Sequence, residues 1–271
     1  MSLKRSRALA RLRLLRAEVE RNGLPAQPQL HHVAALTAGA IEILDRRDSN
    51  RASAAARYLY RIAPQSFRAS GVEDRLACRR GCAWCCHGYV SASAPQIFAA
   101  AGEIRRDAAA FDAVCARIRA TSARVRGLEW RARIALREPC PLLADGACGI
   151  YEARPLSCRG FASFSAEACK RAYDALTDDV MIPQPYANVR SALESALRAA
   201  LKACTLPAVS YELTGALAKA LADSDAEARW LEGETVFDPD SIDRSADAAT
   251  EFQREVILDT VIAAARGEAP R

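Results

Sequence analysis

Two cysteine clusters are the part of this sequence whose residue types and spacing could do chemistry. The first lies between Cys78 and Cys86 and has the spacing CxxxCxxCC. The second contains Cys140, Cys148 and Cys158. Thiols two or three residues apart on a turning backbone can bind one metal ion together, because a tetrahedral thiolate site needs closely spaced sulfurs. We therefore expect the two clusters to fold onto one another as a metal-binding centre.

Eight of the 10 cysteines are predicted metal ligands. Cys115 and Cys204 fall on apolar stripes of expected helices, where a free cysteine is a small buried hydrophobe, so both are predicted to lie in the core. The predicted ligands are Cys78, Cys82, Cys85, Cys86, Cys140, Cys148, Cys158 and Cys169. Eight thiolates would saturate two four-coordinate zinc sites, or supply one or two iron–sulfur clusters. The sequence leaves open the choice between zinc and iron–sulfur, and the number of metals.

The adjacent pair Cys85 and Cys86 bears on that number. Their side chains diverge, so we do not expect both to bind one mononuclear metal. This favours two metals, or a cluster with one neighbouring thiol. His87 follows directly and is an alternative ligand, since mixed cysteine and histidine sites are common.

Four arginines flank the predicted ligands. Four thiolates on one divalent ion carry a charge of about −2, which the protein must neutralise or hydrogen-bond. Arg79, Arg80, Arg154 and Arg159 are therefore the predicted cofactor-binding residues, as donors to the sulfurs. Chance proximity in an arginine-rich chain is the competing explanation.

The combined motif resembles a known family. The segment CxxxCxxCC is followed by Cys140-Pro141-Leu142-Leu143 and by a run from Gly146 to Arg159 that reads G-x-C-x-I-Y-E-x-R-P-x-x-C-R. These residues resemble the YkgJ-like family of zinc- or iron-chelating cysteine-cluster proteins, over roughly residues 78–169. The first gap is one residue longer here than in the family's usual CxxCxxCC label.

The resemblance implies metal ligation by the cysteines of both clusters, with Cys169 lying beyond the strongest part of the motif. It implies a supporting role for Tyr151, Arg154, Pro155 and Arg159. A related branch resembles bacterial flagellin lysine N-methylases. That more distant resemblance implies that some members are iron–sulfur-dependent enzymes that modify proteins.

The elements around the clusters are expected to be helices. Apolar residues recur at helical spacing in segments from about 3–21, 31–46, 50–62, 93–105, 107–126 and 187–204, from Pro207 onward and before Gly267. Asp145-Gly146 between short apolar stretches predicts one tight hairpin, the only β-structure we expect. The fold class is therefore mainly α, with helical flanks around a small cysteine-rich metal-binding centre and at most a short β-hairpin. The predicted domains are residues 1–70, 71–175 and 176–271.

Charge and composition exclude several classes of function. Residues 1–21 contain seven basic and two acidic residues, so they carry the whole formal net charge of +5. The remainder is balanced, which argues against a nucleic-acid partner. The basic N-terminal helix is a candidate contact for a protein partner. We expect no secretory signal and no transmembrane segment, hence a cytoplasmic protein with reduced thiols.

The interpretation is a metal-binding cysteine-cluster protein of bacterial type, with a structural or redox role. The alternative is an iron–sulfur-dependent protein-modifying enzyme such as a lysine N-methylase, and only then is S-adenosylmethionine expected. Cys78, Cys82 and Cys85 match the radical S-adenosylmethionine spacing, but that chemistry usually uses a β/α barrel, and few strands are expected here. A zinc-ribbon DNA-binding module is disfavoured by the balanced charge. No catalytic residue is assigned, and the sequence leaves open whether the protein is an enzyme.

Overall fold

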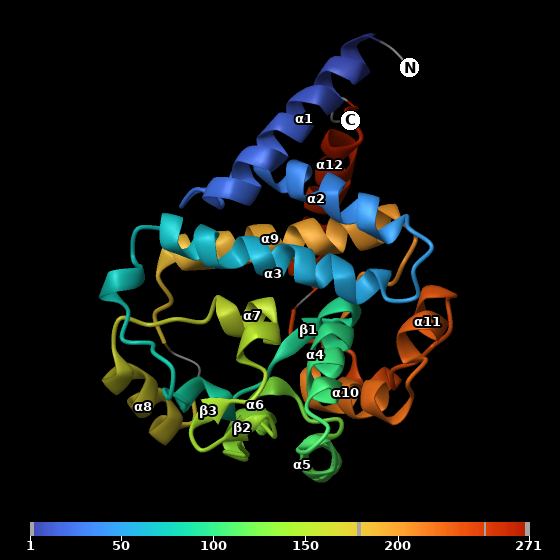
Figure 1. Cartoon of the computed structure of the whole chain (residues 1–271). Coiled ribbons are helices and arrows are strands. Elements are labelled where there is room, and N and C mark those ends of the chain that lie inside the picture. The colour runs from blue at the N-terminus through green and yellow to red at the C-terminus, as the bar shows by residue number, and fades with distance from the viewer. Residues whose placement is uncertain (1–2, 178–179, 247, 269–271) are drawn as a thin grey trace. The chain divides into compact units, whose positions relative to one another are not determined.

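The computed structural model describes residues 3–177, 180–246 and 248–268 (Figure 1). The chain divides into two compact units, each built from segments distant in sequence. Unit 1 comprises Met1–Glu73, Gln184–Ala208 and Ala246–Arg271. Unit 2 comprises Asp74–Pro183 and Val209–Ser245, and contains both cysteine clusters.

The described residues form twelve α-helices and two short antiparallel strand pairs, so the mainly α prediction is confirmed. The helices of unit 1 are α1 (Leu3–Asn22), α2 (Leu30–Leu44), α3 (Arg51–Ala69), α9 (Gln184–Ala203) and α12 (Ala248–Ala265). The helices of unit 2 are α4 (Ala94–Arg106), α5 (Phe111–Val125), α6 (Trp130–Ala135), α7 (Leu156–Arg159), α8 (Ala166–Ala175), α10 (Leu213–Ala222) and α11 (Ala226–Leu231). Its strands are β1 (Ser91–Ser93), β2 (Leu143–Ala144), β3 (Ala147–Cys148) and β4 (Ser210–Glu212).

Helix α2 is the centre of unit 1, because it packs against α1, α3, α9 and α12. Its small residues allow this close approach. Ala34, Ala35 and Ala40 are fully buried, and a Cβ atom on Gly39 would lie 2.5 Å from the hydroxyl oxygen of Tyr58. Burial of these apolar and small faces against neighbouring helices stabilises the unit.

Helix α3 runs further than the sequence predicts. The spacing of apolar residues predicts an end near Ile62, but the helix continues through Pro64 to Ala69. Tertiary packing stabilises the additional turns: Ser66 and Phe67 are buried, and the Leu24 amide donates to the Ser66 hydroxyl oxygen at 2.8 Å.

Unit 2 contains a strand pair that the sequence does not predict. Strands β1 and β4 pair antiparallel with Ala92 opposite Tyr211, and α4 and α10 follow directly from them. The helix expected from Pro207 therefore begins only at Leu213, and Val209 is exposed and precedes the strand. The partners are too far apart in sequence, and each strand too short, for periodicity to indicate the pair.

Of the two cysteines predicted to lie in the core, only one is buried. Cys115 on α5 is buried, so that prediction is confirmed. The prediction for Cys204 is wrong: the residue is only partly buried, and its thiol lies 3.6 Å from a carboxylate oxygen of Asp45. Cys204 lies at the C-terminal end of α9, where its amide still donates to the Ala200 carbonyl at 3.1 Å but its side chain is partly exposed.

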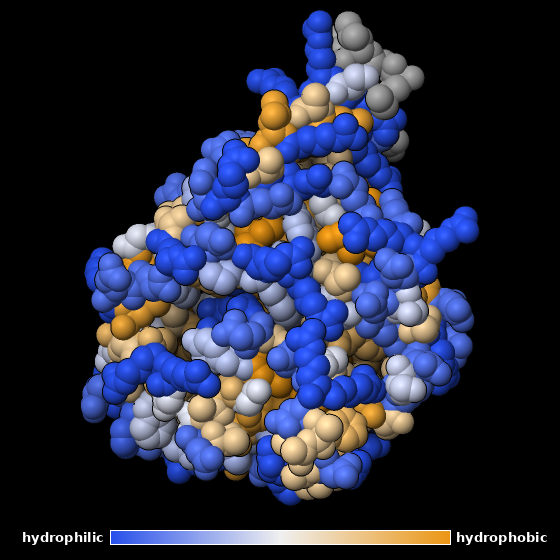
Figure 2. All heavy atoms as spheres, in the orientation of Figure 1, coloured by the Kyte–Doolittle hydropathy of each residue, from blue (hydrophilic) through white to orange (hydrophobic). Residues whose placement is uncertain are grey.

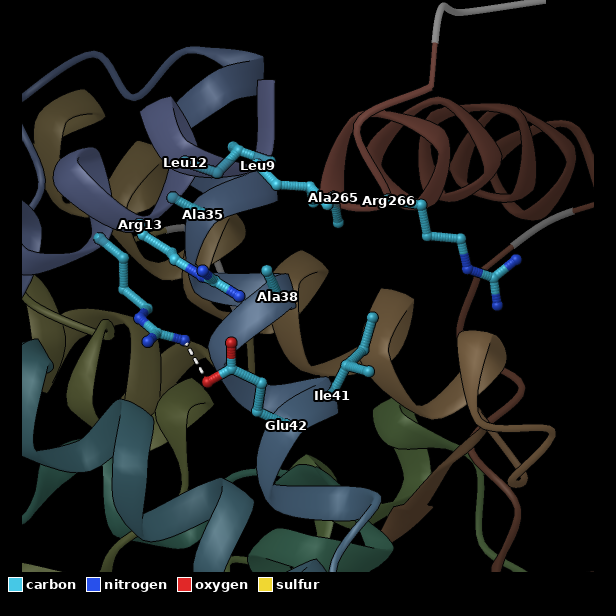
Figure 3. A pocket seen from close by; sticks show the side chains of 10 residues that line it. Leu9, Leu12, Arg13, Ala35, Ala38, Ile41, Glu42, Ala265 and Arg266 are labelled. Carbon is cyan, nitrogen blue, oxygen red and sulfur yellow. Dashed lines mark hydrogen bonds and ion pairs between the residues drawn. The ribbon is translucent and has the colours of Figure 1, made fainter. Parts of the chain in front are cut away.

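Unit 1 also has a small cavity of about 170 Å³ where α1, α2 and α12 meet (Figure 3). Its lining is mostly apolar, with Leu9, Leu12 and Ile41 among the residues drawn, and Arg16 forms an ion pair with Glu42 at 2.7 Å beside it. No cysteine or histidine lines this cavity. Its lining carboxylate, Glu42, is engaged by Arg16.

Hydrophilic residues are widespread on the visible surface, and at the end where α1 lies they are mixed with hydrophobic ones (Figure 2). Several arginines of α1 are exposed and form no ion pair within the described part of the chain: Arg7, Arg11, Arg13 and Arg21. None of the described helices combines the length and apolar character needed to cross a membrane.

Candidate metal centre

Four short segments of unit 2 carry the eight predicted ligands. Cys78 and Cys82 lie in a loop, and Cys85 and Cys86 lie in the following 3₁₀ turn, Trp84–His87. Cys140 precedes strand β2 and Cys148 ends strand β3. Cys158 lies in α7 and Cys169 in α8.

A backbone hydrogen bond joins the two clusters directly. The Cys140 amide donates to the Cys86 carbonyl at 2.7 Å. A Cβ atom built on Gly146 would lie 3.9 Å from the Gly81 carbonyl oxygen, so the tip of the hairpin lies close to the first cluster. The structure thus brings together cysteines that are distant in sequence.

The predicted Asp-Gly hairpin is confirmed. Asp145 and Gly146 have φ angles of 50° and 74°, and β2 pairs with β3 so that Leu143 lies opposite Cys148. Two successive positive φ angles define the tight turn whose twist matches a hairpin. The Leu143 amide also donates to the Cys140 carbonyl at 2.9 Å. The hairpin therefore fixes the relative positions of Cys140 and Cys148.

A buried serine holds the other two distant cysteines in place. The Ser163 amide donates to the Cys78 sulfur at 3.3 Å, and the Ser163 side chain hydrogen-bonds Cys169. The Ala77 amide donates to the Ser163 carbonyl at 2.9 Å. Cys169, which lies beyond the strongest motif, therefore shares a local environment with Cys78.

The thiols lie close enough to oppose one another's ionisation. Burial raises the pKa of Cys158, and the neighbouring Cys140, Cys85 and Cys148 raise it further. Burial likewise raises the pKa of Cys140 to about 11. A hydrogen bond with the Cys86 side chain is the largest cause of the raised pKa of Cys85. A bound cation removes this penalty, because a coordinating thiol is deprotonated outright.

The predicted arginines divide into two pairs. Arg154 stacks on the Tyr151 ring at 4.0 Å, and its charge opposes the upward pKa shifts of Cys85, Cys148 and Cys158. Arg159 donates to the backbone carbonyls of Glu152 and Arg154, which braces the same loop. Arg79 and Arg80 are exposed, and Arg79 lines a cavity described below.

Arg133 is a residue beside the centre that sequence reasoning missed. Its side chain is only 2% exposed, and one guanidinium nitrogen donates to the carbonyls of His87 (3.3 Å) and Glu138 (2.7 Å). These acceptors flank Cys86 and Cys140, so Arg133 connects the backbones of the two clusters. The nearby Glu138 carboxylate pairs with Arg124 instead. No sequence signal distinguishes Arg133 in a chain so rich in arginine.

An open cavity of about 300 Å³ lies beside Cys82. Trp84 and His87 line it, and Tyr173 packs on both rings with centroid distances of 5.5 and 5.0 Å. Its volume is at the lower end of the range for small-molecule sites. A small reactant therefore has access to one predicted ligand.

The donor set fits a thiophilic metal, although the ligand geometry is not assembled. Among the described residues, no three histidine, cysteine, aspartate or glutamate side chains converge in an arrangement that could hold a metal ion. All ten cysteines are free thiols, and eight of them come from the four adjoining segments. Soft thiolates select zinc, copper(I) and iron–sulfur clusters. Metal binding would therefore require these side chains to converge further, as expected when binding is coupled to local folding.

Comparison with known proteins agrees with this donor chemistry. Residues 77–179 match the family model CxxCxxCC, which is described as a putative zinc- or iron-chelating domain. No curated protein and no solved structure matches the chain. The matched segment contains all eight predicted ligands and Arg133.

Proposed function

We propose that the protein binds zinc or an iron–sulfur cluster through its eight clustered cysteines, in a structural or redox role. The observation that carries this proposal is the direct backbone bond between Cys140 and Cys86, which joins two cysteine clusters distant in sequence. The match of residues 77–179 to a chelating domain supports it.

The residues that would hold the metal are Cys78, Cys82, Cys85, Cys86, Cys140, Cys148, Cys158 and Cys169. Closed four-thiolate sites have no open coordination position, which suits stabilisation or electron transfer better than hydrolysis. The chain's own contribution is to position these thiols through the hairpin, Ser163 and Arg133. We propose two metals, because eight thiolates would saturate two four-coordinate sites.

We propose that the protein is cytoplasmic and that it has a protein partner. Metal binding needs reduced thiols, which a compartment such as the cytoplasm maintains. The unpaired arginines of α1 are the surface that we propose for an acidic protein partner. Residues 71–175 are the proposed metal-binding domain.

The cavity beside Cys82 favours a second candidate function. An iron–sulfur-dependent protein-modifying enzyme, such as a lysine N-methylase, needs a reactant to approach the centre, and this cavity would allow it. S-adenosylmethionine would be the cofactor only in this case. The choice of this reaction follows only from the more distant resemblance to lysine N-methylases.

Metal analysis of anaerobically purified protein tests the main proposal. We expect either about two zinc ions per chain or iron with labile sulfide and a broad visible absorption band. Cys82→Ala and Cys158→Ala should lose metal. Cys115→Ala is the matched control, because it removes a buried thiol of the same unit outside the cluster. Unchanged metal content and melting temperature in both cluster variants would refute the assignment.

A further inference from the structure

Three buried side-chain nitrogens near the cysteines have no hydrogen-bond partner within the described part of the chain. They are the Nε atoms of Arg133 and Arg154 and the Nδ1 atom of His87. Buried polar groups are normally hydrogen-bonded, because an unmade bond costs about 1–3 kcal/mol. The two unpaired guanidinium N–H groups therefore indicate acceptors that would lie beside them in the complete site.

The two arginines add charge to this pattern. Arg133 is 2% exposed and forms no ion pair within the described part of the chain. The two carboxylates whose charge reaches it are engaged elsewhere: Glu212 accepts from the Gly215 amide at 2.7 Å, and Glu138 pairs with Arg124. Arg154 is partly buried and stacks on Tyr151. A buried guanidinium without a counter-ion is strongly unfavourable, so buried charges are paired or neighbour metal sites.

The arginines approach the cysteines from different elements. Arg133 belongs to α6 and lies near Cys140, while Arg154 precedes α7 and lies near Cys85, Cys148 and Cys158. A site with four thiolates on a divalent metal carries a charge of about −2, and its sulfurs accept N–H hydrogen bonds. A site with two cysteines and two histidines would be neutral and would leave both guanidinium groups unpaired.

We propose that Arg133 and Arg154 are the counter-charges of the metal centre, which is therefore an anionic, all-sulfur centre. This inference rests on the proposed function and deepens it. Both are positioning residues: they hold the thiolate ligands without binding the metal. His87 is then a hydrogen-bond donor to the centre, in contrast to the alternative in which it replaces a cysteine as a ligand.

The test compares Arg133→Gln, Arg154→Gln and Arg117→Gln by competition of the zinc-loaded protein with a chelator. Arg117 is the matched control, because it donates to the Pro141 carbonyl at 3.1 Å, next to Cys140. Loss of such hydrogen-bonding partners typically lowers metal affinity about 10- to 100-fold. We expect that loss in the first two variants and less than about a 2-fold change in the control.

Two further measurements separate charge from structure. Arg133→Lys and Arg154→Lys should recover part of the lost affinity, because each restores the charge. The melting temperature of the metal-free variants should change less than that of the loaded ones. Wild-type affinity in both glutamine variants would overturn the inference alone. Absence of any metal binding by the wild-type protein would overturn the proposed function and this inference with it.

Discussion

At the residue scale, the candidate metal ligands were predicted mainly from the local spacing of the cysteines. The short gaps between Cys78 and Cys86 predicted a ligand cluster because neighbouring thiols must lie close in space whatever the fold. Arg133 could not be predicted in the same way, since its proximity to Cys140 depends on how α6 packs. The prediction that Cys204 lies in the core was wrong for a related reason, because the burial of this residue depends on where α9 ends.

The adjacent cysteines allow a test of the number of metals. If Cys85 and Cys86 serve different metals, Cys85→Ala and Cys86→Ala should each retain about half of the bound zinc, while the double variant loses all of it. The measurement is zinc content per chain after gel filtration. Complete loss in one single variant with full retention in the other would indicate one metal and a spare thiol.

At the element scale, the hairpin was predictable and the second strand pair was not. The dipeptide Asp145-Gly146 predicts a tight turn by itself, because aspartate and glycine both tolerate the positive φ angles that the turn requires. Strands β1 and β4 are three residues each and pair across more than a hundred residues. Their pairing depends on α4 and α10, which pack together after them. Such a long-range arrangement leaves no periodic signal.

The hairpin turn should affect both stability and metal binding. Gly146→Ala places a Cβ atom on a residue with φ of 74°, which costs about 1–2 kcal/mol and disturbs the position of Cys148. We expect weaker zinc binding in chelator competition. Gly127→Ala is the control, since φ there is 71° and no atom would contact the new Cβ within 4 Å. Equal zinc affinity in both variants would contradict a positioning role for the hairpin.

At the scale of the whole molecule, the chain has two compact units, and tryptophan fluorescence reports on only one of them. All 3 tryptophans, Trp84, Trp130 and Trp230, belong to unit 2. The long helices α1, α2, α3, α9 and α12 belong to unit 1 and contribute strongly to far-ultraviolet circular dichroism. Tryptophan fluorescence therefore follows unit 2 alone, while circular dichroism follows both. A chain with two compact units need not unfold in one cooperative step.

A packing change in unit 1 should leave the metal centre intact. Gly39→Ala brings a Cβ atom within 2.5 Å of the Tyr58 hydroxyl oxygen, and such overpacking typically costs about 1–3 kcal/mol. The circular-dichroism transition should move to lower temperature, with zinc content and the fluorescence transition unchanged. A loss of zinc in this variant would show that the cysteine centre depends on the packing of α2.

Metal removal should destabilise unit 2 and leave the stability of unit 1 unchanged. Ligands that bind only the folded state add their binding free energy to its stability, so a chelator should destabilise unit 2. We expect the fluorescence midpoint to fall on chelation and to return when zinc is added back, while the part of the circular-dichroism transition due to unit 1 stays in place. Metal-free Cys158→Ala is the control, because chelation has no bound metal to remove from it. If chelation leaves the fluorescence midpoint of the loaded wild-type protein unchanged, the metal does not stabilise unit 2, and a redox or catalytic role remains in place of a structural one.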